Sequence, residues 1–293
     1  MKLLVTGRNG QVAQSLASLH QPGVEVIALG RPTLDITDRA TIARAIATHQ
    51  PDVIVSAAAY TAVDKAEADE AAAFAANRDG AKNVAAAAFT AALPVIHLST
   101  DYVFPGDKEA PYTEADPTGP KSVYGRSKLA GEVAVREANP RSTILRTAWV
   151  YSPYGGNFLK TMLRISTERE MLRVVADQYG TPTYALDIAE AIVVVARHMM
   201  EEPQQQNWQG IFHMVSEGET TWAGFAEEIF CQSAARGGPY ARVEPINTEA
   251  YPTPARRPAN SRLDTARFRQ VFEHELPAWR NGVARCLDAL ASE

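Results

Sequence analysis

The chain has 293 residues, of which 46% are hydrophobic and 22% are charged. That balance is typical of a globular protein and excludes disordered and fibrous classes, and the length allows one large domain or two modest ones. A formal net charge of -5 excludes a global attraction to nucleic acid or to anionic membranes, so an anionic ligand must be held by local groups.

Cysteine and histidine usage gives no indication of a metal site. The two cysteines are too few for a disulfide framework, and the six histidines are scattered with no two at ligand spacing. We expect His97, in an apolar run, to be a strand residue with a satisfied hydrogen bond. No apolar run approaches the ~20 residues that span a bilayer, and the N-terminus lacks an export signal. The sequence therefore predicts a cytoplasmic protein with no membrane partner.

Short apolar runs alternate with helix-period segments in the first half of the chain. The expected strands are residues 3–6, 24–29, 53–56, 95–99 and 143–146. Apolar residues at helical spacing lie between them, and the Ala-rich stretch 66–92 is expected to form one long helix. Strands buried on both faces and joined by helical crossovers predict an α/β fold with a Rossmann-type, doubly wound parallel sheet.

The alternation of short apolar runs with helix-period segments becomes less regular after Trp149. Helices are expected at residues 158–168, 187–200, 222–235 and 278–290, whereas the proline-rich run 251–258 cannot be a regular helix. We therefore predict a nucleotide-binding domain over residues 1–150. Residues 151–293 would form a smaller, loop-rich C-terminal substrate-binding lobe, with some segments returning to the main sheet.

A glycine-containing segment follows the first expected strand and opens the first expected helix. Gly7 suits the tight turn, and Gly10 lets the backbone approach a pyrophosphate at the helix N-terminus, where unpaired N–H groups favour anions. Ala13 stands where a third glycine often falls and only a small residue is needed. A glycine pattern alone is as often a plain turn, but its place in a βαβ series predicts a dinucleotide-binding loop.

The end of the second strand bears on which dinucleotide is bound. NAD enzymes usually offer an acidic side chain there, whereas this chain reads Leu29-Gly30-Arg31. Arg31 could pair with a 2′-phosphate, and Arg8 lies within plausible reach of the same group, although either arginine could be a solvated surface residue. The missing acid and the two arginines favour NADPH as the cofactor of the 1–150 domain and leave NADH open.

Tyr124 and Lys128 lie four residues apart, which on a helix places the phenol and the ammonium on one face. A free phenol has a pKa near ~10, and a nearby cation such as Lys128 stabilises the phenolate. In isolation, a surface pair is the more ordinary interpretation. Thr100 changes this, because it closes a strand at the carboxyl edge of the sheet, where ligands bind. Its hydroxyl can bind a carbonyl oxygen that gains negative charge as hydride arrives, and Tyr124 can then protonate it.

Eight segments carry a resemblance to one family. They are residues 7–12 (GRNGQV), 57–67 (AAAYTAVDKAE), 99–106 (STDYVFPG), 124–132 (YGRSKLAGE), 146–151 (RTAWVY), 177–183 (DQYGTPT), 251–255 (YPTPA) and 257–263 (RPANSRL). Through them, nearly the full chain resembles the dTDP-4-dehydrorhamnose reductases, extended short-chain dehydrogenases/reductases that make dTDP-L-rhamnose. The resemblance implies hydride transfer from NADPH to C4 of dTDP-6-deoxy-L-lyxo-4-hexulose (dTDP-4-dehydrorhamnose).

The resemblance also implies roles by position. Thr100, Tyr124 and Lys128 would be catalytic, with Tyr124 the proton donor and Lys128 also holding the nicotinamide ribose. With the residues argued above, the cofactor set is Gly7, Gly10, Gln11, Val12, Gly30, Arg31, Asp35, Ile36, Ala59, Tyr60, Thr61, Tyr124 and Lys128. The substrate set is Thr100, Asp101, Trp149, Val63, Arg257 and Arg262. A tryptophan after a strand is often plain core, and Arg256, Arg257 and Arg262 could form a solvated cluster, so the arginine for the diphosphate stays open.

Ser15 is a departure from the family pattern. Some members are described as metal-bridged dimers that use a glutamate in the first helix, where this chain has Ser15. A dimer bridged by Mg²⁺ is therefore doubtful, while a homodimer stays open.

Three alternative functions were weighed. A dehydratase on this fold would need Asp-Glu after the threonine, and Asp101-Tyr102 argues against it. An NADP-binding regulatory subunit of methionine adenosyltransferase belongs to the same family and can keep the Tyr-x-x-x-Lys pattern, although the compact length favours the enzyme. Another nucleotide-sugar 4-ketoreductase also stays open.

Overall fold

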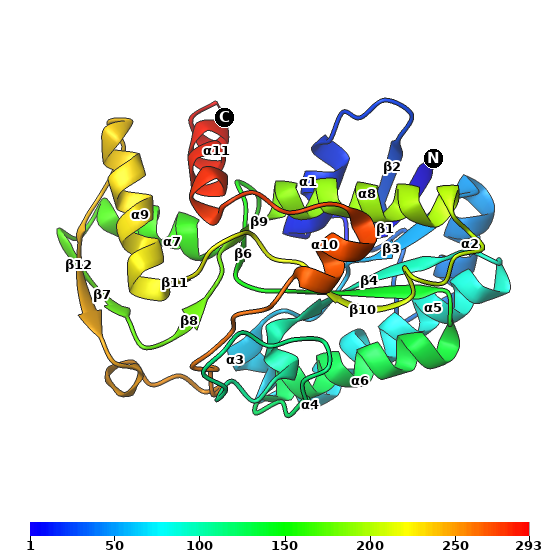
Figure 1. Cartoon of the computed structure of the whole chain (residues 1–293), viewed down its shortest axis with the longest axis horizontal. Coiled ribbons are helices and arrows are strands. Elements are labelled where there is room, and N and C mark those ends of the chain that lie inside the picture. Colours follow the sequence, from blue (N-terminus) through cyan, green and yellow to red (C-terminus); the bar gives the residue numbers. More distant parts are fainter. Residues whose placement is uncertain (293) are drawn as a thin grey trace.

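The computed structural model describes residues 1–292 and is built on a six-stranded parallel sheet (Figure 1). The strand order is β10-β5-β4-β3-β1-β2. The strands are β1 (Lys2–Thr6), β2 (Glu25–Leu29), β3 (Val53–Ser56), β4 (Val95–Thr100), β5 (Ser142–Thr147) and β10 (Gly210–His213). The chain passes from β1 to β2 on one side and then to β3 on the other. This reversal places the switch point, where such folds bind ligands, at the carboxyl ends of β1 and β3.

Helices cover both faces of the sheet because successive strand residues point to opposite sides. Leu3 and Val5 of β1 pack under α1 (Gln11–Ser18) and α8 (Ala185–Glu201), together with α10 (Ala266–Phe272). Leu4 points the other way, toward α2 (Arg39–His49), α5 (Ala81–Thr90) and α6 (Val123–Ala138). The predicted Rossmann-type α/β class is therefore confirmed, and the five expected strands form within one residue of their predicted bounds.

The long helix expected over residues 66–92 forms only from Glu70 onward. A short helix, α3 (Val63–Ala66), ends where the stretch begins, and after a break α4 (Glu70–Phe74), the π-helical η1 (Ala75–Gly80) and α5 follow one another without a gap. The break follows from Asp69, whose carboxylate accepts a hydrogen bond from Ala72 N (3.3 Å) and so caps a new helix. Alanine propensity by itself does not encode this interruption.

The second half of the chain supplies a smaller unit with its own core. Its helices α7 (Phe158–Ser166), α9 (Trp222–Ala235) and α11 (Trp279–Ala291) lie at one end of the molecule (Figure 1). Its short strands are β6 (Val150–Tyr151), β7 (Met171–Val175), β8 (Tyr179–Gly180), β9 (Thr183–Tyr184), β11 (Thr220–Thr221) and β12 (Arg242–Ile246), with a 3₁₀ turn η3 (Thr248–Ala250). Another 3₁₀ turn, η2 (Asp101–Val103), follows β4 in the first half. Buried aromatic residues such as Phe225 and Trp279 dominate this core.

Three elements of the second half belong to the main sheet and its helix layer. β10 pairs with β5, α8 packs on α1, and α10 packs against β10 and α8. A domain boundary at residue 150 stays a prediction. Across residues 1–292 we find no helix with the length and apolar character that crossing a membrane requires.

Candidate active site

The glycine loop after β1 is tightly folded against the end of β3. Gly7 has a φ of +84°, and a Cβ placed there would lie 2.9 Å from the Ala58 Cα. Gly10 N donates to Gly7 O (2.8 Å), and Gly10 caps α1 without a side-chain hydrogen bond. The N–H groups at the start of α1 therefore remain free of a capping side chain, as a diphosphate site requires.

The two residues after Gly10 point in different directions. Gln11 reaches into the second half, where its Oε1 accepts hydrogen bonds from Ser152 Oγ (2.8 Å) and Asn157 Nδ2 (3.0 Å). Val12 is buried in the core between the sheet and α8. Gln11 thus ties the loop to the smaller unit, and Val12 can offer only its backbone to a ligand.

An ion pair occupies the end of β2. Arg31 Nε lies 2.7 Å from Asp35 Oδ2, and the Arg31 side chain is 72% exposed. Hydrogen bonds from Thr37 are the main cause that holds the pKa of Asp35 below its usual value, with a smaller effect of Arg31 and a partial offset from burial. Sequence reasoning found no acid directly after this strand, but the fold brings Asp35 back to it. A phosphate bound at Arg31 would therefore compete with Asp35 for the guanidinium.

The other residues expected near the ribose lie on both sides of this ion pair. Gly30 permits the close approach of Arg8, since a Cβ at Gly30 would lie 3.1 Å from Arg8 Cγ. Ile36 is buried and would be 2.6 Å from a Cβ at Gly80, so its side chain belongs to the core.

The loop after β3, residues 59–61, is fixed by a residue that sequence reasoning missed. Asn77 is 1% exposed in the π-helical turn η1. Its Oδ1 accepts from Tyr60 N (2.8 Å), while its Nδ2 donates to Tyr60 O (3.1 Å) and to Ser127 Oγ (2.9 Å). Ala59 and Tyr60 are half-buried and Thr61 is exposed. A polar residue inside an alanine-rich helix was the only available indication of this role.

Tyr124 and Lys128 lie in the first two turns of α6, which begins after Ser122. The Ser122 hydroxyl accepts from Gly125 N (3.1 Å) and caps the helix. Lys128 is 3% exposed, and its Nζ donates to Leu98 O (2.7 Å) on β4. The Tyr124 ring meets the Tyr102 ring edge-on, with 5.5 Å between centroids.

Thr100 and Asp101 stand beside Tyr124 at the end of β4. Thr100 Oγ1 donates to Asp101 Oδ1 (2.9 Å), and a hydrogen bond involving the Thr100 hydroxyl stabilises the Tyr124 phenolate. Burial raises the pKa of Asp101 to about 6, partly offset by hydrogen bonds from Ser261 and Thr100. The fold therefore brings Thr100, Asp101, Tyr124 and Lys128 together at one edge of the sheet.

The Tyr124 phenol is protonated at neutral pH. Burial raises its pKa well above the ordinary value, and the Asp101 charge raises it further, against the smaller effect of Thr100. Burial also lowers the pKa of Lys128 to about 8, with Glu132 opposing that shift. We had expected Lys128 to favour the phenolate, but burial outweighs such an effect. A neutral phenol is the form that can donate a proton.

Trp149 joins the site to the second half of the chain. It follows β5 with a φ of +48°, and its ring stacks on Trp222 with 3.6 Å between centroids. A Cβ at Gly180 would lie 2.5 Å from Trp149 Cε2, so the ring lies flat against that glycine. Trp149 is half-buried, so it packs in the core and also presents an edge outward. Val63, at the start of α3, is likewise half-buried.

The three candidate arginines occupy different surroundings. Arg257 forms an ion pair with Asp64 (2.8 Å) and donates to the Tyr102 hydroxyl (3.3 Å), next to the Tyr102–Tyr124 ring pair. Arg262 instead pairs with Glu219 (3.0 Å), and Arg256 is exposed. Of the three, only Arg257 contacts a residue that touches Tyr124.

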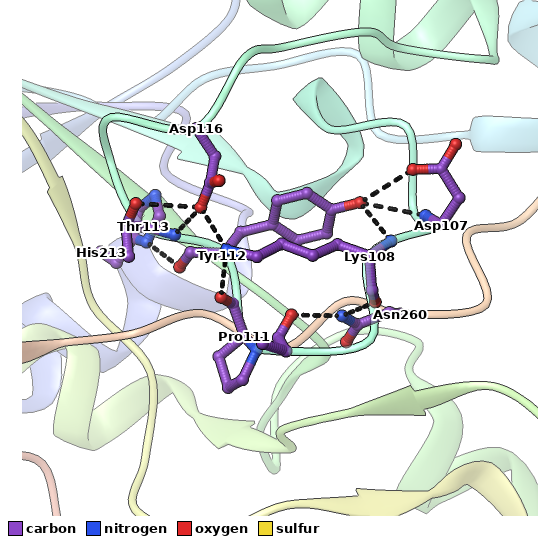
Figure 2. A network of polar contacts seen from close by, with 9 residues as sticks. Asp107, Lys108, Pro111, Tyr112, Thr113, Asp116, His213 and Asn260 are labelled. Atoms are coloured by element: carbon purple, nitrogen blue, oxygen red, sulfur yellow. Dashed lines mark hydrogen bonds and ion pairs between the residues drawn. The ribbon is translucent and has the colours of Figure 1, made fainter.

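A polar network holds the loop after η2 against β10 (Figure 2). The Tyr112 hydroxyl accepts from the backbone N–H groups of Asp107 (3.0 Å) and Lys108 (3.1 Å). Lys108 Nζ pairs with Asp116 (2.7 Å), and the His213 ring contacts Tyr112 O (3.1 Å). The network therefore joins β10 to residues 107–116.

Residues 1–292 contain no group of three His, Cys, Asp or Glu side chains placed to hold a metal ion. Ser15 is 1% exposed in α1 and therefore buried within the chain.

The sheet, the uncapped glycine loop and the Thr–Tyr–Lys cluster at the strand ends define a Rossmann-type oxidoreductase of the short-chain dehydrogenase/reductase class. The model of the RmlD substrate binding domain family matches residues 1–292, and the chain belongs to this family.

Relatives of the chain are named as reductases or ketoreductases of dTDP-linked sugars. The chain is 51% identical over 293 residues to a dTDP-4-dehydrorhamnose reductase from Sinorhizobium fredii, covering 100% of the chain and 99% of the relative. It is 40% identical over 296 residues to a "probable dTDP-4,6-dihydroxy-2-methyloxan-3-one 4-ketoreductase" from Streptomyces antibioticus, covering 100% and 97%. The crystal structure of a dTDP-4-dehydrorhamnose reductase from Bacillus anthracis in complex with NADP superposes with a TM-score of 0.89 at 34% identity, covering 98% and 99%.

Proposed function

We propose that this protein is an NADPH-dependent reductase that converts the C4 ketone of dTDP-4-dehydrorhamnose to the alcohol of dTDP-L-rhamnose. The observation that carries this proposal is the neutral Tyr124 phenol held beside Thr100 at the carboxyl edge of the sheet. Full-length similarity to reductases of this name, one of them in complex with NADP, supports it.

The residues at the switch point fit a dinucleotide. Gly7 and Gly10 leave room that a side chain would fill, and the start of α1 offers N–H groups to the diphosphate. Arg31, with Arg8 beside it, would hold the 2′-phosphate in competition with Asp35. The backbone of residues 59–61, fixed by Asn77, would line the nicotinamide end. When bound, NADPH supplies the hydride.

The chain's own residues would stabilise the negative charge on the ketone oxygen and supply the proton to O4. When the ketone binds, the Thr100 hydroxyl would turn its one hydrogen from Asp101 to the ketone oxygen, where negative charge develops. Tyr124 would then give its proton to O4. The raised pKa keeps the phenol protonated until then and makes it a weaker acid, but the alkoxide is a stronger base still and therefore takes the proton. The buried Lys128 ammonium, held by Leu98 O, would stabilise the phenolate that Tyr124 leaves behind and bind the nicotinamide ribose.

The sugar nucleotide would lie between the two halves of the chain. Asp101 and Trp149 face the substrate from the ends of β4 and β5, and Val63 shapes the same wall. We assign the diphosphate to Arg257 rather than Arg262, because Arg257 lies beside the Tyr102–Tyr124 ring pair. In this arrangement residues 1–150 bind NADPH and residues 151–293 supply much of the sugar-nucleotide site. A homodimer and a cytoplasmic location stay predictions.

The test uses purified protein, NADPH and dTDP-4-dehydrorhamnose, with loss of the reduced-cofactor absorbance and NMR identification of the product. We expect stoichiometric NADPH oxidation and dTDP-L-rhamnose. Oxidation that gives a different sugar would favour another 4-ketoreductase, the activity for which the Streptomyces antibioticus relative is named. Binding of NADPH without any oxidation would favour a regulatory role.

A further inference from the structure

A buried polar layer lies between α6 and the carboxyl half of the sheet. It consists of His97 and Ser99 on β4, Arg146 on β5, and Lys128 and Glu132 on α6, and none of these residues is more than 5% exposed. Deeper in the same face, Val95 and Ile144 continue the strands as apolar core. The layer therefore replaces hydrophobic packing only where the strands approach the site.

Glu132 is the centre of this layer. One carboxylate oxygen accepts from Ser99 Oγ (2.5 Å) and Arg146 Nε (2.9 Å), and the other accepts from Arg146 Nη2 (2.7 Å). The fork of Arg146 thus grips the carboxylate with two bonds, the geometry that fixes both partners most firmly. The Arg146 guanidinium also lies over the Phe104 ring, 4.9 Å from its centroid.

These contacts join the elements that carry the proposed catalytic residues. Ser99 immediately precedes Thr100 on β4, and Glu132 lies one helical turn after Lys128 on α6. The hydrogen bond between Ser99 and Glu132 therefore fixes the distance from Thr100 to the face of α6 that bears Tyr124 and Lys128. Phe104 extends the connection to the loop that follows η2.

The titratable and charged groups around Lys128 come from three elements. Tyr124 and Glu132 share its helix, His97 faces it from β4, and Arg146 approaches from β5 through Glu132. Burial and the Lys128 charge lower the pKa of His97 well below its usual range, so His97 is neutral. Burial lowers the pKa of Lys128 to about 8, and Glu132 opposes that shift.

We propose that Glu132 is a positioning residue of the reductase: it ties the strand end that bears Thr100 to α6 and keeps the Lys128 ammonium charged. This inference rests on the proposed function for its kinetic consequence. Its electrostatic part concerns the chain alone and can be measured without a substrate.

Three variants separate the charge of Glu132 from its contacts. Glu132→Gln removes the charge, so both the alkaline limb of kcat and the titration of Lys128 should move down by about one pH unit. Glu132→Asp and Ser99→Ala keep a carboxylate but break the tie to β4. They should lower kcat about tenfold or more while the alkaline limb and the KM values stay near those of the wild type. Glu137→Gln changes an exposed glutamate of the same helix and should change nothing.

The titration of Lys128 is followed by NMR on protein labelled at the lysine Cε, with the resonance assigned through Lys128→Arg. Because Glu132→Gln leaves Arg146 unpaired, its folding is checked against Glu132→Gln/Arg146→Met, which removes both charges. An unchanged Lys128 titration in both folded variants would overturn the electrostatic part. A kcat of Ser99→Ala and Glu132→Asp equal to that of the wild type would overturn the positioning part. A wild type without activity would instead count against the proposed function, and the Lys128 titration would still decide the charge effect.

Discussion

The two faces of the central sheet are built from the same strands but have different chemistry. Toward α1 and α8, Ile96 and Leu145 join a continuous apolar core. Toward α6, the next residues along the same strands are His97 and Arg146, which are equally buried but polar. Because successive strand residues point to opposite faces, one face can form an apolar core while the other places charged side chains near the strand ends. The desolvation of the two charges on this face is offset in part because Arg146 and Glu132 form a two-bond ion pair.

The largest effect is expected for Tyr124→Phe, which removes the only group on the charged face assigned to proton transfer. We expect kcat to fall by about 10²–10⁴-fold, while NADPH binding stays near normal. Steady-state kinetics and a fluorescence titration with NADPH measure the two quantities. Tyr240→Phe, at a position 64% exposed, is the matched control. Unchanged turnover in Tyr124→Phe would remove the proposed proton donor.

A direct test of the two faces compares Arg146→Leu with Ile96→Val. The first leaves the Glu132 carboxylate buried and unpaired and should lower the free energy of unfolding by about 3–5 kcal/mol. The second removes one methyl group from the apolar face and should cost about 0.5–1.5 kcal/mol. Urea denaturation measures both. The double variant Glu132→Leu/Arg146→Leu should recover most of the loss, and equal costs for the two single variants would contradict the comparison.

A substitution at the edge of the charged face should have a smaller effect on catalysis. Arg257→Ala is expected to raise KM for the sugar nucleotide by about 10–100-fold with little change in kcat, since one charge-assisted contact contributes about 1.5–3 kcal/mol. Arg262→Ala provides the matched comparison, because Arg262 is engaged with Glu219 instead. A larger KM effect at Arg262 than at Arg257 would reverse the assignment of the diphosphate.

The smallest effect is expected for Asp101, which makes the free energy of unfolding depend on pH. Its pKa is raised to about 6 by burial, so the folded chain holds a proton that the unfolded chain has released. Between pH ~4 and ~6 stability therefore falls as pH rises, and the penalty is complete above pH ~6. Asp101→Asn should stabilise the protein by about 1–3 kcal/mol at neutral pH, with the gain vanishing below pH ~4. Unfolding curves across this range measure the effect, and a gain independent of pH would exclude this cause.

The sequence by itself determined the features that depend on local order. Apolar runs marked the five strands, Gly7 and Gly10 marked the turn between the first strand and the first helix, and the four-residue spacing of Tyr124 and Lys128 placed both on one helical face. These features follow from periodicity and backbone conformation within a few residues, so no knowledge of the tertiary structure was needed to find them.

Only the tertiary structure decided the pairings between distant residues. It pairs Glu132 with Arg146 across a helix and a strand, joins Arg257 to Asp64 over 193 positions, and places Asn77 under the loop at Tyr60. It also buries the Tyr124 phenol, and this burial raises the pKa of the phenol above its ordinary value. Contacts between residues far apart in the sequence, and the burial of their side chains, depend on which surfaces pack together in the folded chain. Local sequence patterns do not specify that packing.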